Sequence, residues 1–181
     1  AWAWDTNFMR GGLFWKTENR SKNTCVNAPA AIAACLLWKA CGETKYRDQA
    51  GAIIDWLKSV LSAGHGRIYD NIKTNGSISR NSLTYNQGTF IGACNFLGRT
   101  KDASEAADFV MRNQGASVNG FCILPPYRIT GDLAGFHGIF LRWMARYMRD
   151  QHLESTYLPW LGQYHRDRVR DSCLCRFILQ F

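Results

Sequence analysis

The chain has 181 residues, of which 46% are hydrophobic and 20% are charged. This balance is typical of one globular domain with a substantial core and excludes an intrinsically disordered chain. No apolar run reaches the roughly 18 residues of a membrane-spanning helix, and the first five residues lack the basic and apolar regions of a signal peptide. We therefore expect no membrane-spanning segment.

The net charge is +8, from 22 Lys and Arg against 14 Asp and Glu. The basic residues are scattered, and their one dense cluster is Arg166, Arg168 and Arg170. A protein that tracks a phosphate backbone needs a clustered basic face. We therefore predict a solvated basic surface and no nucleic-acid partner.

The predicted elements begin with a short strand or hairpin arm at 11–15. Helical periodicity follows, and the predicted helices are 27–41, 45–62, 86–98, 102–114, 133–150 and 153–164. The first, third and fifth are apolar nearly all round, which is typical of buried helices. The second and fourth are amphipathic. Burial should therefore alternate along the chain.

The links between the predicted helices alternate as well. Short turns follow the first, third and fifth helices, whereas the long loops 63–85 and 115–132 follow the second and fourth. This predicts an all-α fold of three helical hairpins with an inner and an outer layer, as in an α/α toroid or solenoid. The helical pattern ends near 164. We assign 1–164 to this domain and 165–181 to an irregular tail.

Polar residues stand at the starts of the three apolar helices, at the end of the bundle that carries the long loops. Asn27, Asn86 and Asp132 fit helix N-caps. Amides, carboxylates and free helix N–H groups together suit a neutral hydroxyl-rich ligand better than a phosphate. The candidate binding residues are Asn23, Asn27, Asp70, Tyr85, Asn86, Gln87, Asp132 and Trp15.

Each candidate has a structural alternative. Asp70 fits a turn-forming Asp-Asn pair, and Trp15 and Tyr69 are either sugar-stacking rings or core aromatics. Tyr85 and Asn86 fit a helix cap, whereas Gln87 is not needed for capping.

The histidines and cysteines do not predict a metal site. His65 and His137 lack metal-ligand spacing and are interpreted as structural. The C-x-C pair Cys173 and Cys175 has no second ligand pair. The remaining cysteines in apolar helical runs are interpreted as small core residues, namely Cys35, Cys41 and Cys94. We predict no metal and no cofactor.

Five motifs in this order and spacing resemble glycoside hydrolase family 76, the bacterial endo-α-1,6-mannanases. They cover roughly residues 4 to 160 and are Arg10-Gly11-Gly12-Leu13-Phe14-Trp15, Lys22-Asn23-Thr24-Cys25-Val26-Asn27-Ala28-Pro29, Ile68-Tyr69-Asp70-Asn71-Ile72, Thr84-Tyr85-Asn86-Gln87-Gly88 and Gly131-Asp132-Leu133-Ala134-Gly135-Phe136 with Gly138-Ile139-Phe140. The resemblance implies an (α/α)6 barrel, hydrolysis of α-1,6-linked mannan with retention, and an extracellular or periplasmic location. Mannan or a manno-oligosaccharide would be the partner.

The resemblance also implies a catalytic pair of adjacent aspartates, located before the Gly-Gly-x-x-Trp segment. A retaining glycosidase needs two carboxyl groups roughly 5–5.5 Å apart. No two aspartates are adjacent in these 181 residues, and three hairpins are half of a six-hairpin barrel. We therefore assign no catalytic residue and expect the chain to correspond to the later part of a mannanase-like domain. His137 stands where lysine is more usual, and the tail after Leu161 lies outside the pattern.

Three functions stay open at the level of sequence. The first is a mannan-acting glycosidase or the major piece of one. The second is a non-catalytic carbohydrate-binding remnant, and the third is a solenoid that engages an acidic polymer through its basic surface. Other sugar enzymes built on α/α toroids share the architecture, and fold alone does not exclude them.

Overall fold

A computed structural model describes residues 3–118, 121–124 and 135–168 of the chain. Its helices are α1 (Thr24–Cys41), α2 (Thr44–Val60), α3 (Thr84–Leu97), α4 (Thr100–Phe109), α5 (Phe136–Gln151) and α6 (Glu154–Arg168). A π-helical segment, Val110–Gln114, continues α4. The strands are β1 (Ser21–Asn23), β2 (Asn71–Lys73), β3 (Ile78–Ser79), β4 (Ala116–Val118) and β5 (Phe121–Ile123). Helices dominate, as the sequence predicts.

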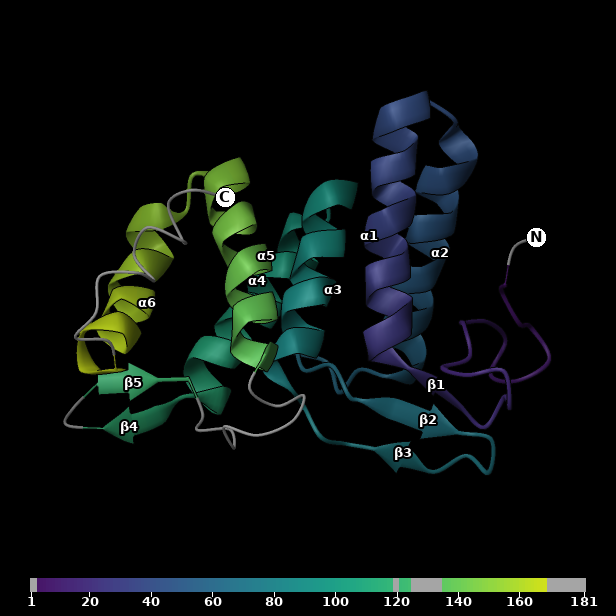
Figure 1. Cartoon of the computed structure of the whole chain (residues 1–181), viewed down its shortest axis with the longest axis horizontal. Coiled ribbons are helices and arrows are strands. Elements are labelled where there is room, and N and C mark those ends of the chain that lie inside the picture. Colours follow the sequence, from purple (N-terminus) through teal and green to yellow (C-terminus); the bar gives the residue numbers. More distant parts are fainter. Residues whose placement is uncertain (1–2, 119–120, 125–134, 169–181) are drawn as a thin grey trace.

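The helices form three consecutive hairpins, α1/α2, α3/α4 and α5/α6 (Figure 1). α3 packs against both α1 and α5, whereas α2 and α4 pack against the odd-numbered helix of their own hairpin. The buried residues Ile53 and Trp56 of α2 turn toward this core. The predicted layering of α1, α3 and α5 with α2 and α4 packed outside is therefore confirmed.

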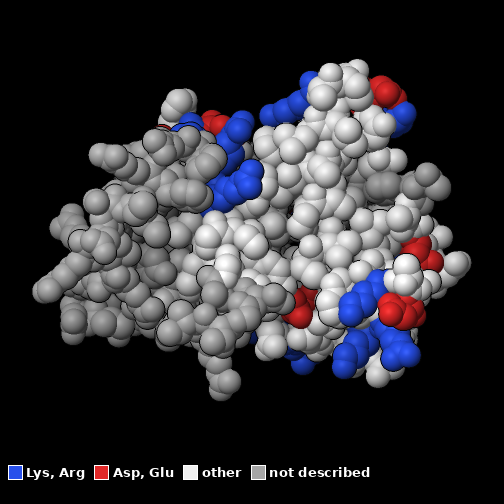
Figure 2. Space-filling model, in the orientation of Figure 1, with Lys and Arg blue, Asp and Glu red and all other residues white. Residues whose placement is uncertain are grey.

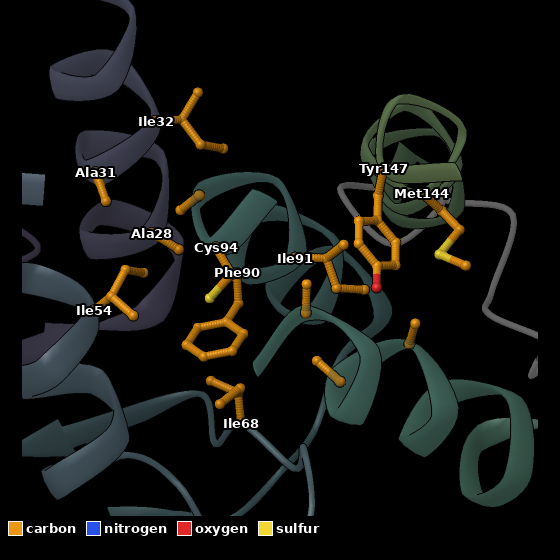
Figure 3. Close-up of a cluster of buried hydrophobic side chains, with 14 of the residues drawn as sticks. Ala28, Ala31, Ile32, Ile54, Ile68, Phe90, Ile91, Cys94, Met144 and Tyr147 are labelled. Atoms are coloured by element: carbon orange, nitrogen blue, oxygen red, sulfur yellow. The ribbon is translucent and has the colours of Figure 1, made fainter. Parts of the chain in front are cut away.

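The core lies around α3, and Figure 3 labels side chains of α1, α2, α3 and α5 together with Ile68 from the loop before β2. Twelve of the 14 residues of α3 are buried, so the helix has no solvent-facing side. Gly88 and Gly92 allow its close approach to α5. A Cβ atom added at Gly88 would lie 2.6 Å from the Cα of Phe140, and one at Gly92 would lie 2.6 Å from the Trp143 ring.

Two of the predicted N-caps are wrong. α1 begins at Thr24 with Asn23 in the N-cap position, so Asn27 lies inside the helix. α3 begins at Thr84 with Leu83 in the N-cap position, so Asn86 also lies inside. Neither N-cap side chain makes a capping hydrogen bond. The side chains of Asn27 and Asn86 are used in tertiary contacts instead.

The expected burial pattern needs two further corrections. α5 is amphipathic, because Arg142 and Arg149 lie exposed opposite buried residues such as Phe140 and Met144. Cys41 ends α1 on the surface, whereas Cys35 and Cys94 are core residues as predicted.

The prediction that no segment is long enough to span a membrane also needs correction at α1. By length and composition alone, its 18 residues are long and apolar enough for a span. The same composition suits a core helix, and one side of α1 packs on α2 and α3. Its other side exposes about half of Leu36 and Leu37.

A small antiparallel sheet, in the order β1-β2-β3, lies at the end of the bundle where α1 and α3 begin (Figure 1). Ser21 pairs with Lys73 and Asn23 with Asn71, while Asn71 also pairs with Ser79. The predicted strand 11–15 is reduced to one bridge, between Phe14 and Lys22. The long loop 61–83 therefore contributes most of the sheet.

The last described helix extends past the predicted end at 164 to Arg168. The proposed boundary between 164 and 165 stays a prediction. Residues 169–181, including Cys173 and Cys175, lie outside the described residues.

Candidate functional site

The first turn of α1 holds the loop that enters β2. The Thr24 backbone N–H donates to the Asp70 carbonyl at 2.8 Å, and the Thr24 hydroxyl donates to the Tyr69 carbonyl at 2.6 Å. A free N–H group at the helix start is thereby satisfied by the loop. This contact places the Asp70 side chain at the junction of α1, β2 and α3.

Asp70 is the centre of a polar cluster. One carboxylate oxygen accepts from Asn86 Nδ2 at 3.0 Å and lies 3.5 Å from the Tyr85 hydroxyl. The other accepts from Asn71 Nδ2 at 2.7 Å. The oxygens Asn71 Oδ1 and Asn86 Oδ1 are buried and have no hydrogen-bond partner in the described structure. The cluster therefore combines an oriented carboxylate with acceptors that are not used.

Tyr85 joins this cluster to the start of α5. Its ring lies 4.1 Å from that of Phe136, centroid to centroid, and its hydroxyl hydrogen-bonds the Cys25 thiol. Burial, together with the nearby Cys25 and Asp70, raises the pKa of Tyr85 far above its ordinary value. Burial and the Asp70 charge also raise the pKa of Cys25. Both groups are therefore protonated at neutral pH, and the Tyr85 hydroxyl keeps its proton.

Asn86 and Gln87 are fully buried. With its amide oriented so that both ends are paired, the Gln87 nitrogen donates to the Gly66 carbonyl at 2.9 Å, and its oxygen accepts from Ile68 N–H and the Ser82 hydroxyl at 2.9 and 2.6 Å. Gln87 thus holds the two ends of the loop between α2 and α3. Asn86 and Gln87 therefore lie beneath the surface at which Asp70 is partly exposed.

Asn27 and Asn23 also hold neighbouring segments through side-chain hydrogen bonds. Asn27 is fully buried and exchanges hydrogen bonds with the backbone of Leu13, accepting from its N–H at 2.8 Å and donating to its carbonyl at 3.0 Å. Asn23 is nearly buried and accepts from the Ser21 hydroxyl at 2.7 Å. Asn27 therefore fixes the segment that leads to Trp15.

The two candidate stacking rings differ in accessibility. Trp15 is 50% exposed, near the outer end of the sheet. Tyr69 is partly buried, and the Arg67 guanidinium lies 5.4 Å from its ring centroid. Trp15 therefore offers the more open platform.

Sequence reasoning did not assign a site role to Cys25 or Phe136, which contact Tyr85 in the cluster. His137, interpreted as structural, lies with Nδ1 3.1 Å from the Thr84 hydroxyl at the start of α3. The sequence did contain a signal for these residues, because Cys25 and Phe136 lie inside two of the five family motifs and His137 lies directly beside one. Asp132 lies outside the described residues. The structure thus brings Asp70, Tyr85 and Asn86 into contact and places Asn23 on the neighbouring strand.

The described residues contain no group of three or more His, Cys, Asp or Glu side chains that could hold a metal ion. The arrangement is instead one of amide, hydroxyl and carboxylate groups around an aromatic ring. Comparison with protein families then gave one decisive match, in which the sequence profile of glycosyl hydrolase family 76 covers residues 1–174.

The chain belongs to glycosyl hydrolase family 76.

Solved structures agree with this assignment. An inactive variant of an α-1,6-mannanase from Salegentibacter sp., in complex with α-1,6-mannotriose, is 30% identical, with a TM-score of 0.73. The Lin0763 protein from Listeria innocua is also 30% identical, with a TM-score of 0.79. The match covers 90% of this family 76 chain in both cases, and 49% and 48% of the respective relatives. Comparison with curated proteins gave no significant match.

A more distant structure shares the fold. Dfg5 from Chaetomium thermophilum, in complex with glucosamine, is 22% identical with a TM-score of 0.78, and the match covers 90% of this chain and 45% of that one. The family 76 chain therefore spans about half the length of these relatives. Its fold is that of the family's α/α-toroid enzymes. The family match also reaches ten residues past the predicted domain boundary at 164.

Proposed function

We propose that this family 76 chain carries part of the glycan-binding surface of a glycosidase acting on α-1,6-linked mannan. The observation that carries the proposal is the Asp70 cluster, in which a carboxylate is held by Asn71, Tyr85 and Asn86 at the starts of two helices. Oriented carboxylates and hydroxyls beside an aromatic ring are what a neutral sugar requires. The similar Salegentibacter mannanase, solved with α-1,6-mannotriose, supports this substrate class.

Within this proposal the candidates have different roles. Asp70 and Tyr85 contact sugar hydroxyls, and Trp15 stacks on a pyranose face farther along the sheet. Asn23 lies beside them on β1. The buried Asn27, Asn86 and Gln87 act by holding these groups in place. Asp132, outside the described residues, stays a candidate sugar contact from the sequence.

The retaining mechanism also belongs to the proposal. Nucleophilic attack and proton donation at a glycosidic bond need two carboxyl groups about 5–5.5 Å apart. The 181 residues hold no two adjacent acidic residues, so we assign the chemistry of the intact enzyme to a carboxyl pair outside these 181 residues.

The binding role of Asp70 is tested by calorimetric titration with α-1,6-mannotriose. Asp70→Ala should weaken binding about tenfold or more, because a hydrogen bond to a charged group contributes about 1.5–3 kcal/mol. Asp48→Ala, which removes an exposed aspartate on α2, is the matched control and should leave affinity unchanged. Gln87→Ala should also weaken binding by loosening the loop between α2 and α3.

Circular dichroism of each variant should show a folded bundle, so that lost affinity is not lost structure. Unchanged affinity in folded Asp70→Ala and Gln87→Ala would remove both residues from the binding surface.

One alternative function fits the same absence of adjacent acidic residues. The lack of adjacent acidic residues fits a non-catalytic carbohydrate-binding remnant as well as a piece of an enzyme. The discriminating observation is the gene sequence upstream of Ala1. A segment carrying an Asp-Asp pair in the same reading frame supports the enzyme, and its absence supports the binding remnant.

A further inference from the structure

A second surface lies at the outer end of the sheet, away from Asp70. The hairpin between residues 15 and 21 forms a pocket of about 290 Å³ lined by Trp15, Lys16, Glu18, Arg20 and Ser21. The hairpin is closed at its base by a hydrogen bond from the Trp15 backbone N–H to the Ser21 carbonyl at 2.9 Å. Its tip turns at Asn19, whose φ of 53° is left-handed, a conformation that Asn tolerates. The pocket is therefore part of a defined hairpin.

Two residues of the pocket lining, Trp15 and Ser21, adjoin the solvent face of the sheet. Phe14 pairs with Lys22 and Ser21 pairs with Lys73, so Trp15, Ser21 and Lys73 form a cross-strand row on one face. Lys22 and Ile72 point to the opposite face and are fully buried. Asn71, beside Asp70, is two residues from Lys73 and thus about 7 Å along the strand. The Asn71 amide, which donates to the Asp70 carboxylate, therefore links the Asp70 cluster to the face that carries Lys73 and Trp15.

The charged side chains around the pocket are unusual for a site that binds a neutral sugar. Lys16, Arg20 and Lys73 are exposed, and none of them forms an ion pair with another residue in the described ranges. Lys16 Nζ lies 4.3 Å from the Trp15 ring centroid. Glu18 is the one carboxylate of the lining. Figure 2 shows basic side chains gathered with a few acidic ones at this end of the molecule, lower right in the view.

We propose that the Trp15 pocket is a distal subsite for an anionic saccharide unit, one that carries a phosphate or a carboxylate group. The indole offers a stacking face for the sugar ring. Arg20 and Lys73 offer unpaired cationic donors for the anion, and guanidinium groups match the geometry of both phosphate and carboxylate oxygens. The inference rests on the proposed function only in assuming that the same glycan also contacts Asp70.

The test compares three probes by NMR titration of the 181-residue chain, with the Trp15 indole N–H signal assigned from Trp15→Phe. The probes are α-1,6-mannobiose, the same disaccharide with a phosphate monoester, and the same disaccharide with a terminal uronic acid. The phosphorylated probe should bind about tenfold more tightly than the neutral one at low salt, and less so as salt rises. The uronate arm shows whether a carboxylate substitutes for phosphate.

The double variant Arg20→Gln/Lys73→Gln should lose this preference and keep its affinity for the neutral disaccharide. The control Lys45→Gln/Lys101→Gln removes the same charge from exposed sites on α2 and α4 and should keep the preference. Equal binding of neutral and anionic probes by the wild type would overturn the proposal, and so would equal losses in the two double variants.

If the proposed function is wrong, these titrations give a different pattern of binding. If mannan is not the ligand, the neutral disaccharide does not bind and Asp70→Ala changes nothing. The anionic subsite then still stands if anionic probes shift the Trp15 signal in an Arg20- and Lys73-dependent way, and falls if they do not.

Discussion

Lys22 shows how one residue positions the segment that precedes the site. Its side chain is fully buried, and Nζ donates to the Asp5 carboxylate at 2.7 Å and to the carbonyls of Asp5, Phe8 and Gly11 at 2.9, 2.6 and 2.6 Å. The ammonium also lies 4.8 Å from the Phe14 ring centroid. A buried charge is tolerated when it is paired and fully hydrogen-bonded. Lys22 therefore organises residues 5–14 around one point.

Replacing Lys22 by Met should destabilise the fold by about 3 kcal/mol, because four acceptors lose their common donor. Lys45→Met, which removes an exposed ion pair with Glu43, should leave stability nearly unchanged, because solvent screens such a pair. Urea unfolding followed by circular dichroism measures both. Similar effects in the two variants would show that burial does not set the contribution of Lys22.

The same pair gives stability a pH dependence. The hydrogen bond from Lys22 holds the pKa of Asp5 below its ordinary value of 3.8. A depressed folded-state pKa means that the contribution is complete at neutral pH and is lost progressively from about pH 5 downward as Asp5 is protonated. The difference in unfolding free energy between wild type and Lys22→Met should therefore shrink at acidic pH. A constant difference down to about pH 2 would contradict this assignment.

At the scale of elements, the contact between α3 and α5 depends on glycine. Gly88 faces the backbone of Phe140, and the gap leaves no room for a Cβ atom. The apolar pattern of 86–98 predicted burial of this helix, but it did not indicate which neighbour comes so close. Only the packed helices show why glycine follows Gln87.

Gly88→Ala should destabilise the bundle by about 1–3 kcal/mol, because overpacking forces two backbones apart. Gly138→Ala is the control, since a Cβ atom at this α5 position meets nothing within 4 Å. It should be neutral or stabilising by up to about 1 kcal/mol through helix propensity. Thermal denaturation compares the two. Equal melting temperatures would show that α5 shifts at little cost.

At the scale of the whole molecule, the chain combines the proposed glycan-binding surface with a sequence that has no adjacent acidic residues. The 181-residue chain should therefore bind α-1,6-mannan oligosaccharides without hydrolysing them at an enzymatic rate. A reducing-end assay on the purified chain measures this. Robust turnover that disappears in Asp70→Ala would show that Asp70 takes a catalytic role and would contradict the prediction.

The sequence by itself determined the helical class, the hairpin order and the family, because hydrophobic periodicity and motif spacing are local properties of a chain. It also indicated Asp70, Tyr85 and Asn86 as neighbours, since helix starts and long loops share one end of a hairpin bundle. The distinction between Asp70 at the cluster centre and Gln87 behind it was decided by tertiary structure. Both are polar residues near a helix start, and only packing shows which hydrogen bonds are already used.

Tertiary structure also decided which partners Asn27, Asn86 and Lys22 bind. N-cap preference is a local tendency, and it gave way where burial offered the amides of Asn27 and Asn86 better partners elsewhere in the chain. A lysine in a polar stretch is normally exposed. Lys22 is buried because the carbonyls that satisfy it come from residues up to 17 positions away, and such long-range convergence leaves no trace in local pattern.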